Sequence, residues 1–203
     1  IKDWISVLRP GLKPQKAKIP ALAFPGKSGI IEKLPRGVVG IIAPWNFPLG
    51  NFFKPLFPAL LCGNTVVLKP SEYSPRTAQW MVEILNEFLP ENVVSCVYGY
   101  GETAQALIRS GIDAVTFTGS YATGRKVAAT AAEKMIPVSL ELGGKDAAIV
   151  LEDCDLDRTV AGIQQWALNN AGQACGAIDR VYVKSEIAEE FIQKLAQSVS
   201  RLA

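Results

Sequence analysis

The sequence has 203 residues, which is enough to bury a sizeable core without help from disulfides or metal ions. Hydrophobic residues make up 49% and charged residues 20%, a balance typical of a folded globular protein and not of a disordered tail. The formal net charge is +2 without any run of basic residues, so no nucleic-acid partner is predicted. The apolar stretches are all shorter than the ~20 residues that span a membrane, which predicts no membrane span.

The lack of histidine excludes several classes of active site. A chain with His 0 cannot form a Ser-His-Asp triad, a Cys-His dyad or a His-ligated zinc or iron site. The four cysteines, Cys62, Cys96, Cys154 and Cys175, are far apart and form no Cys-x-x-Cys pair, so no metal site is predicted and a reducing, cytoplasmic setting is favoured. Cys62 and Cys96 lie in apolar runs and are expected to be inert core thiols.

Residues 1–35 differ in composition from the rest of the chain. They hold several lysines and five of the 13 prolines, and they show no clear period beyond a short strand at 30–34. We interpret them as an N-terminal arm or connection.

From residue 36 onward, short apolar runs alternate with helical patterns. Ser74 followed by Pro75 predicts the start of one helix, and Asp155 predicts the cap of another. The alternation indicates βαβ units and therefore an α/β fold, a doubly wound parallel sheet with helices on both faces. The predicted strands cover 37–42, 65–69, 93–98, 113–118, 137–142, 146–151 and 178–183, and the predicted helices cover 75–88, 101–109, 120–134, 155–168 and 187–199.

Two loops at predicted strand ends suit a phosphate. Residues 99–104 match the G-x-G-x-x-A pattern of dinucleotide-binding loops, but the acidic residue expected about 20 positions later is absent, and a plain tight turn explains them equally well. Ser120 stands at a predicted helix N-terminus with Gly124 four residues later, where free N–H groups and the helix dipole favour an anion. A simple serine cap is the equally good alternative.

Four further side chains are candidates for chemistry. Lys69 and Glu72 could hold a ribose, although these residues alone favour a solvated ion pair. Cys175 lies in a small, polar, turn-forming stretch that a substrate could approach, or it merely fills a loop. Glu141 ends a predicted strand beside a glycine pair, where another backbone or a ligand can come close, or it is simply solvated.

Taken together, five segments resemble the aldehyde dehydrogenase superfamily. They occur in the family's order and spacing over roughly residues 36–183. The segments are Pro44-Trp45-Asn46-Phe47-Pro48, Lys69-Pro70-Ser71-Glu72, Phe117-Thr118-Gly119-Ser120 with Gly124, Glu141-Leu142-Gly143-Gly144-Lys145, and Asn170-Ala171-Gly172-Gln173-Ala174-Cys175. The stretches 137–145 and 170–175 are similar to the branch that includes fatty and coniferyl aldehyde dehydrogenases.

The resemblance implies NAD(P)-dependent oxidation of an aldehyde to a carboxylic acid. Cys175 would be the nucleophile that forms a thiohemiacetal and then a thioester, Asn46 would contribute to the oxyanion hole, and Glu141 would activate water. NAD is the implied coenzyme, with NADP as the alternative, and no metal is implied. The implied coenzyme-binding residues are Trp45, Lys69, Glu72, Gly101, Gly119, Ser120, Gly124 and Leu142.

The resemblance also implies a domain organisation: a Rossmann-like sheet of the aldehyde dehydrogenase type, followed by the beginning of a second α/β catalytic domain. Residues 1–35 would be part of an oligomerisation region, 36–142 the NAD(P)-binding domain, and 143–203 the start of the catalytic domain. Full-length members continue well beyond residue 203, so we expect a truncated member that binds NAD weakly without turnover, and a homo-oligomer only at full length.

Two other functions compete with this one. A truncated chain could be a catalytically silent dinucleotide-binding domain, or the protein could be a CoA-acylating relative. Glu141 argues against the CoA-acylating branch, because a water-activating base serves hydrolysis of the thioester. Gly176 stands where many members carry a hydroxyl residue, with little expected consequence.

Overall fold

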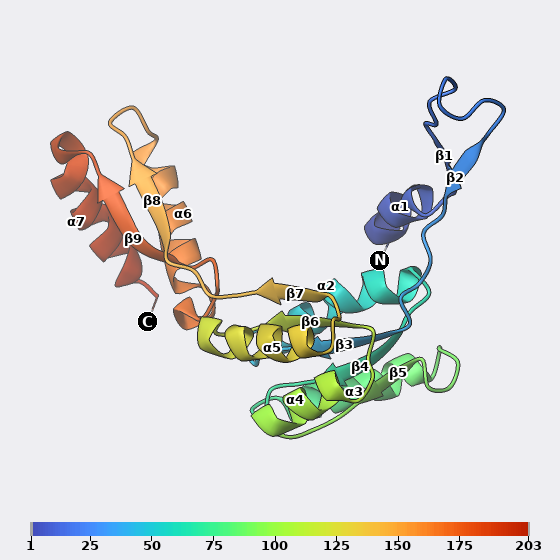
Figure 1. The fold of residues 1–203 in the computed structure, drawn as a ribbon. Coiled ribbons are helices and arrows are strands. Elements are labelled where there is room, and N and C mark those ends of the chain that lie inside the picture. Colours follow the sequence, from blue (N-terminus) through green and yellow to red (C-terminus); the bar gives the residue numbers. More distant parts are fainter. Residues whose placement is uncertain (1, 203) are drawn as a thin grey trace. The chain divides into compact units, whose positions relative to one another are not determined.

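The computed structural model describes residues 2–202, except for the side chains of Lys2 and Trp4. The chain divides into two compact units, Ile1–Glu141 (unit 1) and Leu142–Ala203 (unit 2), which we describe separately (Figure 1). Unit 1 contains α1 (Lys2–Gly11), β1 (Gln15–Ala17), β2 (Gly29–Ile31), β3 (Val38–Ile42), α2 (Pro48–Leu61), β4 (Thr65–Lys69), α3 (Pro75–Asn86), β5 (Val94–Cys96), α4 (Gly101–Arg109), β6 (Ala114–Thr118), α5 (Tyr121–Glu133) and β7 (Val138–Glu141). Unit 2 contains β8 (Asp146–Val150), α6 (Leu156–Leu168), η1 (Asn169–Gly172), β9 (Ile178–Val183), η2 (Ser185–Ile187) and α7 (Ala188–Val199), the two η elements being short 3₁₀ turns.

The centre of unit 1 is a five-stranded sheet in the order β5-β4-β3-β6-β7. All four neighbouring pairs are parallel, as the alternation of strands and helices predicted. The apolar runs of β3 and β4 are buried because helices cover the sheet on both faces. This confirms the predicted α/β fold with a parallel central sheet.

The helices of unit 1 divide between the two faces of the sheet. α2 and α3 pack against each other and against β3–β5, while α4 and α5 pack against each other and against β3, β6 and β7 (Figure 1). Because β-α-β crossovers are right-handed, chains that wind outward in opposite directions from β3 place their helices on opposite faces. The core beneath α2 and α3 includes Ile41, Phe52, Leu56, Leu68 and Met81.

The order of the strands reverses between β3 and β6. From β3 the chain runs outward to β4 and β5, and it then returns to β6 on the other side of β3 and continues to β7. At such a reversal the loops that leave two neighbouring strands turn in opposite directions, which opens a crevice at the carboxyl ends of the strands. The loops that begin at Ala43 and Gly119 flank this position.

Unit 2 is a parallel pair of strands, β8 and β9, with α6 and α7 packed together. Its core contains Val150, Val160, Ile163 and Phe191. Other apolar side chains of the strands are solvent-exposed, including Ile149 at 74% and Tyr182 at 56%. Asp155 caps α6 as predicted, because its Oδ1 accepts the N–H of Arg158 at 3.1 Å.

Two helices were not predicted from the sequence. Residues 1–35 showed no clear helical period, yet α1 forms there and β1 pairs with β2 in an antiparallel ladder. The strand expected at 30–34 is Gly29–Ile31. α2 was missed because it is apolar on all sides and carries Pro55 and Pro58, so neither its period nor its composition is typical of a surface helix.

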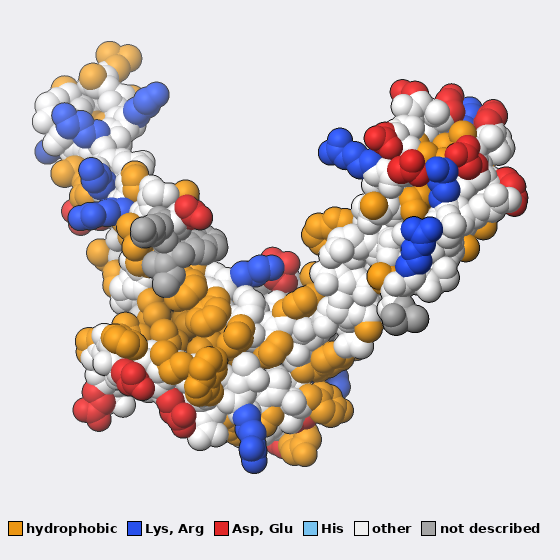
Figure 2. Space-filling view, turned by 180° about the vertical axis from the view of Figure 1, so that it is seen from behind, with side chains coloured by type: hydrophobic (Ala, Val, Ile, Leu, Met, Phe, Trp, Pro, Cys, Tyr) orange, Lys and Arg blue, Asp and Glu red, His pale blue; other side chains and the backbone are white. Residues whose placement is uncertain are grey.

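The expectations for α3 were partly wrong. The helix begins at Pro75 as predicted, but Ser74 makes no capping hydrogen bond, and its buried Oγ has no partner among the described residues. The predicted helix extended to residue 88, whereas α3 ends at Asn86, and Phe88 beyond its end is 81% exposed. Figure 2 shows hydrophobic side chains gathered over α2 and α3, where Trp80 is also exposed.

The helices of residues 2–202 include none that is long and apolar enough to cross a bilayer.

Candidate functional site

The predicted site residues of unit 1 lie in loops at one edge of its sheet. Because the five strands are parallel, their carboxyl ends all meet there. Two backbone hydrogen bonds extend the ladder past the strand ends: the N–H of Ala43 donates to the carbonyl of Lys69 at 3.1 Å, and the N–H of Gly119 donates to the carbonyl of Glu141 at 3.0 Å. These bonds hold the loops after β3 and β6 beside the ends of β4 and β7.

Lys69 is a charged side chain held inside the fold. Its residue is only 4% exposed, and its Nζ lies 3.9 Å from the Oε2 of Glu72, which also accepts a 3.4 Å hydrogen bond from the Oγ of Ser71. Burial lowers the pKa of the Lys69 ammonium, while the carboxylates of Glu72 and Glu102 act in the opposite direction. Lys69 is therefore not half of a solvated pair, as the residues alone suggested. It is a cation positioned by the sheet.

The loop after β5 turns on Gly99. Its φ of +146° is a conformation that other residues rarely adopt, and a Cβ there would meet the Oγ1 of Thr103 at 2.0 Å. Gly101 starts α4 and has open space where a side chain would begin. The next residue, Glu102, places an exposed carboxylate in the first turn of α4.

Ser120 caps α5 beside a crowded glycine. Its Oγ accepts the N–H of Thr123 at 3.3 Å, so the alternative of a serine cap is correct as far as the helix is concerned. A Cβ on Gly119 would lie 2.6 Å from the ring of Phe117, which is buried and unable to move aside. Gly124, the other glycine of this motif, is buried within α5.

The remaining predicted residues of unit 1 lie at the ends of β3 and β7. Trp45 is 45% exposed, and the Oδ1 of half-buried Asn46 accepts a 3.1 Å hydrogen bond from the Nδ2 of Asn51 on α2. This bond holds the Asn46 amide relative to the first turn of α2 and directs its oxygen toward that helix. Glu141 ends β7 and is exposed.

Cys175 lies in unit 2, after a strained turn. Asn170, Ala171 and Gly172 follow one another with φ values of +53°, +57° and +75°, of which only the glycine adopts this region without strain. Such strained conformations cluster at functional sites. The Cys175 side chain that follows is exposed.

The glycine pair before β8 approaches the backbone of Cys175. A Cβ on Gly144 would lie 2.7 Å from the Cys175 carbonyl oxygen, whereas Gly143 has open space. The sequence indicated that another backbone or a ligand could come close to this pair, and in the structure the nucleophile candidate's own backbone does so. Leu142, also predicted for the coenzyme, is half-buried at the start of unit 2.

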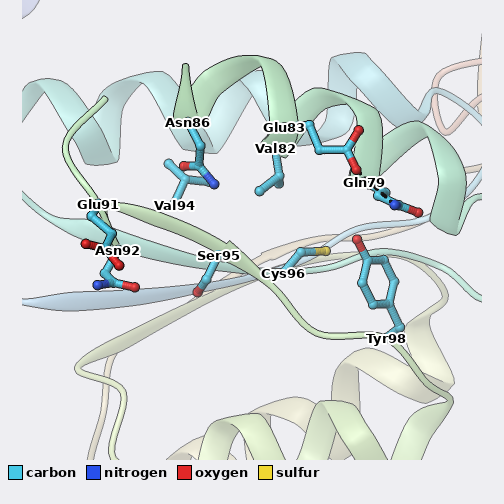
Figure 3. Close-up of a pocket in the computed structure, with 10 residues that line it drawn as sticks. All are labelled: Gln79, Val82, Glu83, Asn86, Glu91, Asn92, Val94, Ser95, Cys96 and Tyr98. Carbon is cyan, nitrogen blue, oxygen red and sulfur yellow. Dashed lines mark hydrogen bonds between the residues drawn. The ribbon is translucent and has the colours of Figure 1, made fainter. Parts of the chain in front are cut away.

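A cleft of about 500 Å³ lies between α3 and β5 (Figure 3). Its ten lining residues include none of the predicted site residues; they include Glu83, Asn92, Cys96 and Tyr98. Burial raises the pKa of the Cys96 thiol, despite a hydrogen bond with Tyr98 and the charge of Lys69, which both act to lower it. Cys96 is thus a protonated, partly buried thiol, in agreement with its expected inertness.

The structure therefore separates the predicted residues into two groups. Unit 1 brings those from Trp45 to Glu141 to one sheet edge, and unit 2 holds Leu142 and Cys175. Glu102 and the strained turn at Asn170–Gly172 were not found from the sequence, although the Asn-Ala-Gly run signalled a turn. In residues 2–202 no group of three or more acidic or cysteine side chains is arranged to hold a metal ion.

Comparison with known proteins defines the class to which this fold and edge belong. The model of the aldehyde dehydrogenase family matches residues 7–203. The chain is 42% identical over 192 residues to a 4,4'-diapolycopene aldehyde oxidase of Methylomonas sp, covering 94% of this chain and 36% of that protein.

Solved structures of aldehyde dehydrogenases also resemble this chain. An aldehyde dehydrogenase from Brucella melitensis biovar abortus 2308 superposes with a TM-score of 0.93 at 31% identity, covering 99% of this chain and 42% of that one. PnpE in complex with nicotinamide adenine dinucleotide superposes with a TM-score of 0.86 at 36% identity, covering 93% of this chain and 38% of that one.

The chain belongs to the aldehyde dehydrogenase family. It spans about two fifths of the length of the relatives that it matches.

Proposed function

We propose that this chain carries the coenzyme half and the nucleophile of an enzyme that oxidises an aldehyde to a carboxylic acid with NAD. The observation that carries the proposal is the sheet edge of unit 1. There a buried lysine at the end of β4, a glycine loop after β5 and a capped helix N-terminus after β6 lie along the carboxyl ends of the strands, in a sheet whose strand order reverses between β3 and β6. Open parallel sheets bind nucleotides at this edge, near such a reversal.

The residues of this edge fit an adenine dinucleotide. Lys69 and Glu72 present a fixed donor and an acceptor, which suit the hydroxyls of a ribose. Gly119, where any side chain would strike the Phe117 ring, and the N-terminus of α5 behind Ser120 offer backbone N–H groups to a pyrophosphate. Gly101, Gly124, Trp45 and Leu142 would complete the contacts. Because Glu72 would accept a 2′-hydroxyl and repel a 2′-phosphate, NAD should be preferred over NADP.

The catalytic roles follow from the chemistry of three side chains. Cys175 would attack the aldehyde carbon through its sulfur, and the Asn46 amide and the Cys175 N–H would stabilise the resulting oxyanion. When bound, the nicotinamide would accept the hydride whose loss converts the thiohemiacetal into a thioester. Glu141 would then take a proton from water, which attacks the thioester carbon and releases the carboxylic acid and the Cys175 thiol. No step requires histidine.

The wider setting is part of the same proposal. Residues 36–142 would form the NAD(P)-binding domain, 143–203 the start of a catalytic domain, and 1–35 a part of the oligomerisation region. The partners would be a small-molecule aldehyde and, in a longer protein, further copies of the chain, without nucleic acid. The setting would be cytoplasmic.

Binding of NAD to the 203-residue chain tests the proposal. Isothermal titration should give a measurable dissociation constant for NAD, which Lys69→Met weakens about tenfold through loss of a charge-assisted hydrogen bond. Lys134→Met is the matched control, since Lys134 is exposed at the far end of α5. Absence of NAD binding, or equal weakening by both variants, would contradict the proposed site.

The nucleophile is tested separately. Cys175→Ser should leave NAD affinity unchanged and should abolish aldehyde-dependent acylation of the protein in the presence of NAD, measured by intact mass. Acylation that persists in the serine variant would assign the chemistry to another thiol.

A further inference from the structure

A second carboxylate, that of Glu102, leaves the sheet at the same edge as the lysine of the proposed coenzyme site. Lys69 and Glu72 follow β4, and Glu102 follows the neighbouring parallel strand β5, so both loops leave the sheet at the same edge. We infer that Glu102, beside Glu72, selects the 2′ group of the dinucleotide and excludes a 2′-phosphate. The inference rests on the proposed function and adds a residue that occupies a variable position of the 99–104 glycine pattern, to which the pattern assigns no role.

The acidic residues near Lys69 outnumber the basic ones. Glu72 is its nearest carboxylate at 3.9 Å, and Glu102 is the next that acts on its ammonium. In the segments 69–74 and 97–103, Lys69 is the only basic residue, against these two acids. The lysine charge is therefore already balanced, with one negative charge in excess, before any ligand arrives.

Glu102 also lies at the N-terminal end of its helix, α4. Free N–H groups at a helix N-terminus attract anions. In α4 the carboxylate of Glu102 lies in the first turn, where its negative charge interacts favourably with the helix dipole and opposes the approach of a further anion. The N-terminus of α5 carries no acidic residue in its first turn. The two helix starts at this edge thus differ in charge, and α5 is the one left for a phosphate.

The consequence for the ligand is a matter of charge. A 2′-hydroxyl is neutral and can donate to a carboxylate and accept from Lys69. A 2′-phosphate would bring about two negative charges toward two carboxylates and a single lysine. Even at the high effective dielectric of a protein surface, like charges that lie a few ångströms apart oppose binding measurably. Because Glu102 is exposed, salt should screen its share of this repulsion.

The experiment compares NAD and NADP binding to the 203-residue chain by isothermal titration at low salt. Glu102→Gln should lower the ratio of the NADP to the NAD dissociation constant by about three- to tenfold, mainly by tightening NADP, and the change should shrink at high salt. Glu87→Gln is the matched control, because it removes the same charge from an exposed position at the end of α3 and should leave the ratio unchanged. Glu102→Lys should lower the ratio further than Glu102→Gln.

The outcomes are distinct. A ratio that Glu102→Gln leaves unchanged while NAD still binds, or that Glu87→Gln lowers equally, would overturn the role of Glu102 and leave the coenzyme site standing. A chain that binds neither dinucleotide would overturn the proposed function, and the inference with it.

Discussion

The two units use the same element, a parallel strand pair, in different surroundings. In unit 1 the strands β3 and β4 lie inside a five-stranded sheet with helices on both faces, and Ile41 and Leu68 are fully buried. In unit 2 the pair β8–β9 has a small core, and Ile149 and Tyr182 are exposed. Parallel sheets are stable when both faces are covered, so unit 1 has the arrangement that gives rigidity by itself.

This difference extends to the site residues. Lys69 is held by a buried strand end and by Glu72, and its position follows from the core of unit 1. Cys175 is exposed on a loop that follows three residues with positive φ. The proposed coenzyme site is thus preorganised by packing, whereas the proposed nucleophile Cys175 depends on the geometry of one turn and on its approach to Gly144.

The largest expected effect comes from the core of unit 1. Phe52 is fully buried on α2, and Phe52→Ala should lower the free energy of unfolding by about 3–5 kcal/mol. Phe88→Ala removes the same ring from a position that is 81% exposed and should change it by less than about 0.5 kcal/mol. Urea denaturation monitored by circular dichroism measures both. Equal losses would show that unit 1 is not stabilised by the core beneath α2.

Thiol reactivity compares the units directly. Iodoacetamide at pH 7.5 should modify Cys175 at least tenfold faster than Cys96, because Cys175 is exposed while Cys96 is partly buried with a raised pKa. Mass spectrometry of the digested chain after short labelling times gives both rates. Faster labelling of Cys96 than of Cys175 would contradict this assignment.

Two neighbouring glycines test the turn that holds Cys175. Gly144→Ala would place a Cβ against the Cys175 carbonyl oxygen and should cost about 1–3 kcal/mol through backbone displacement. The same displacement of the backbone should change the rate at which iodoacetamide alkylates Cys175. Gly143→Ala meets nothing within 4 Å and serves as the control for both readouts. If both variants behave alike, the close approach of Gly144 to Cys175 does not set the position of the nucleophile.

The sequence predicted most of the sheet because its strands are short, largely apolar segments bounded by turn residues. It missed α2, whose prolines and high overall hydrophobicity obscure the helical period, and it extended α3 to residue 88 although the helix ends at Asn86. Local patterns report neither how far a helix extends nor which apolar side chains find partners.

The candidate site was predictable as residue types and not as an arrangement. Motifs identified Lys69 and Glu72, but the residues alone favoured a solvated pair, since burial depends on neighbours distant in sequence. Glu102 occupies a variable position of the 99–104 pattern, and its proposed role arises because β5 lies beside β4. The close approach of Gly144 to Cys175 likewise joins residues about thirty positions apart, which only the fold brings together.

The smallest effect concerns the pH dependence of stability in unit 1. Burial raises the pKa of Cys96 above its ordinary value of 9.0, so the unfolded chain loses this proton before the folded chain does. The stability that results is fully present below pH 9.0 and is lost as the pH rises through the folded pKa. Lys69 acts oppositely, because its lowered pKa makes stability rise as the pH approaches 10.5. The raised pKa of Tyr98 adds a decline in stability only above its ordinary value of 10.0.

Comparison of wild type with Cys96→Ala between pH 7.5 and 9.8 isolates the thiol. The free energy of unfolding of the wild type should fall by about 1 kcal/mol or less relative to that of the variant, measured by urea denaturation. Parallel pH profiles for the two proteins would show that Cys96 titrates normally and that its partly buried position beside Tyr98 does not hold in solution.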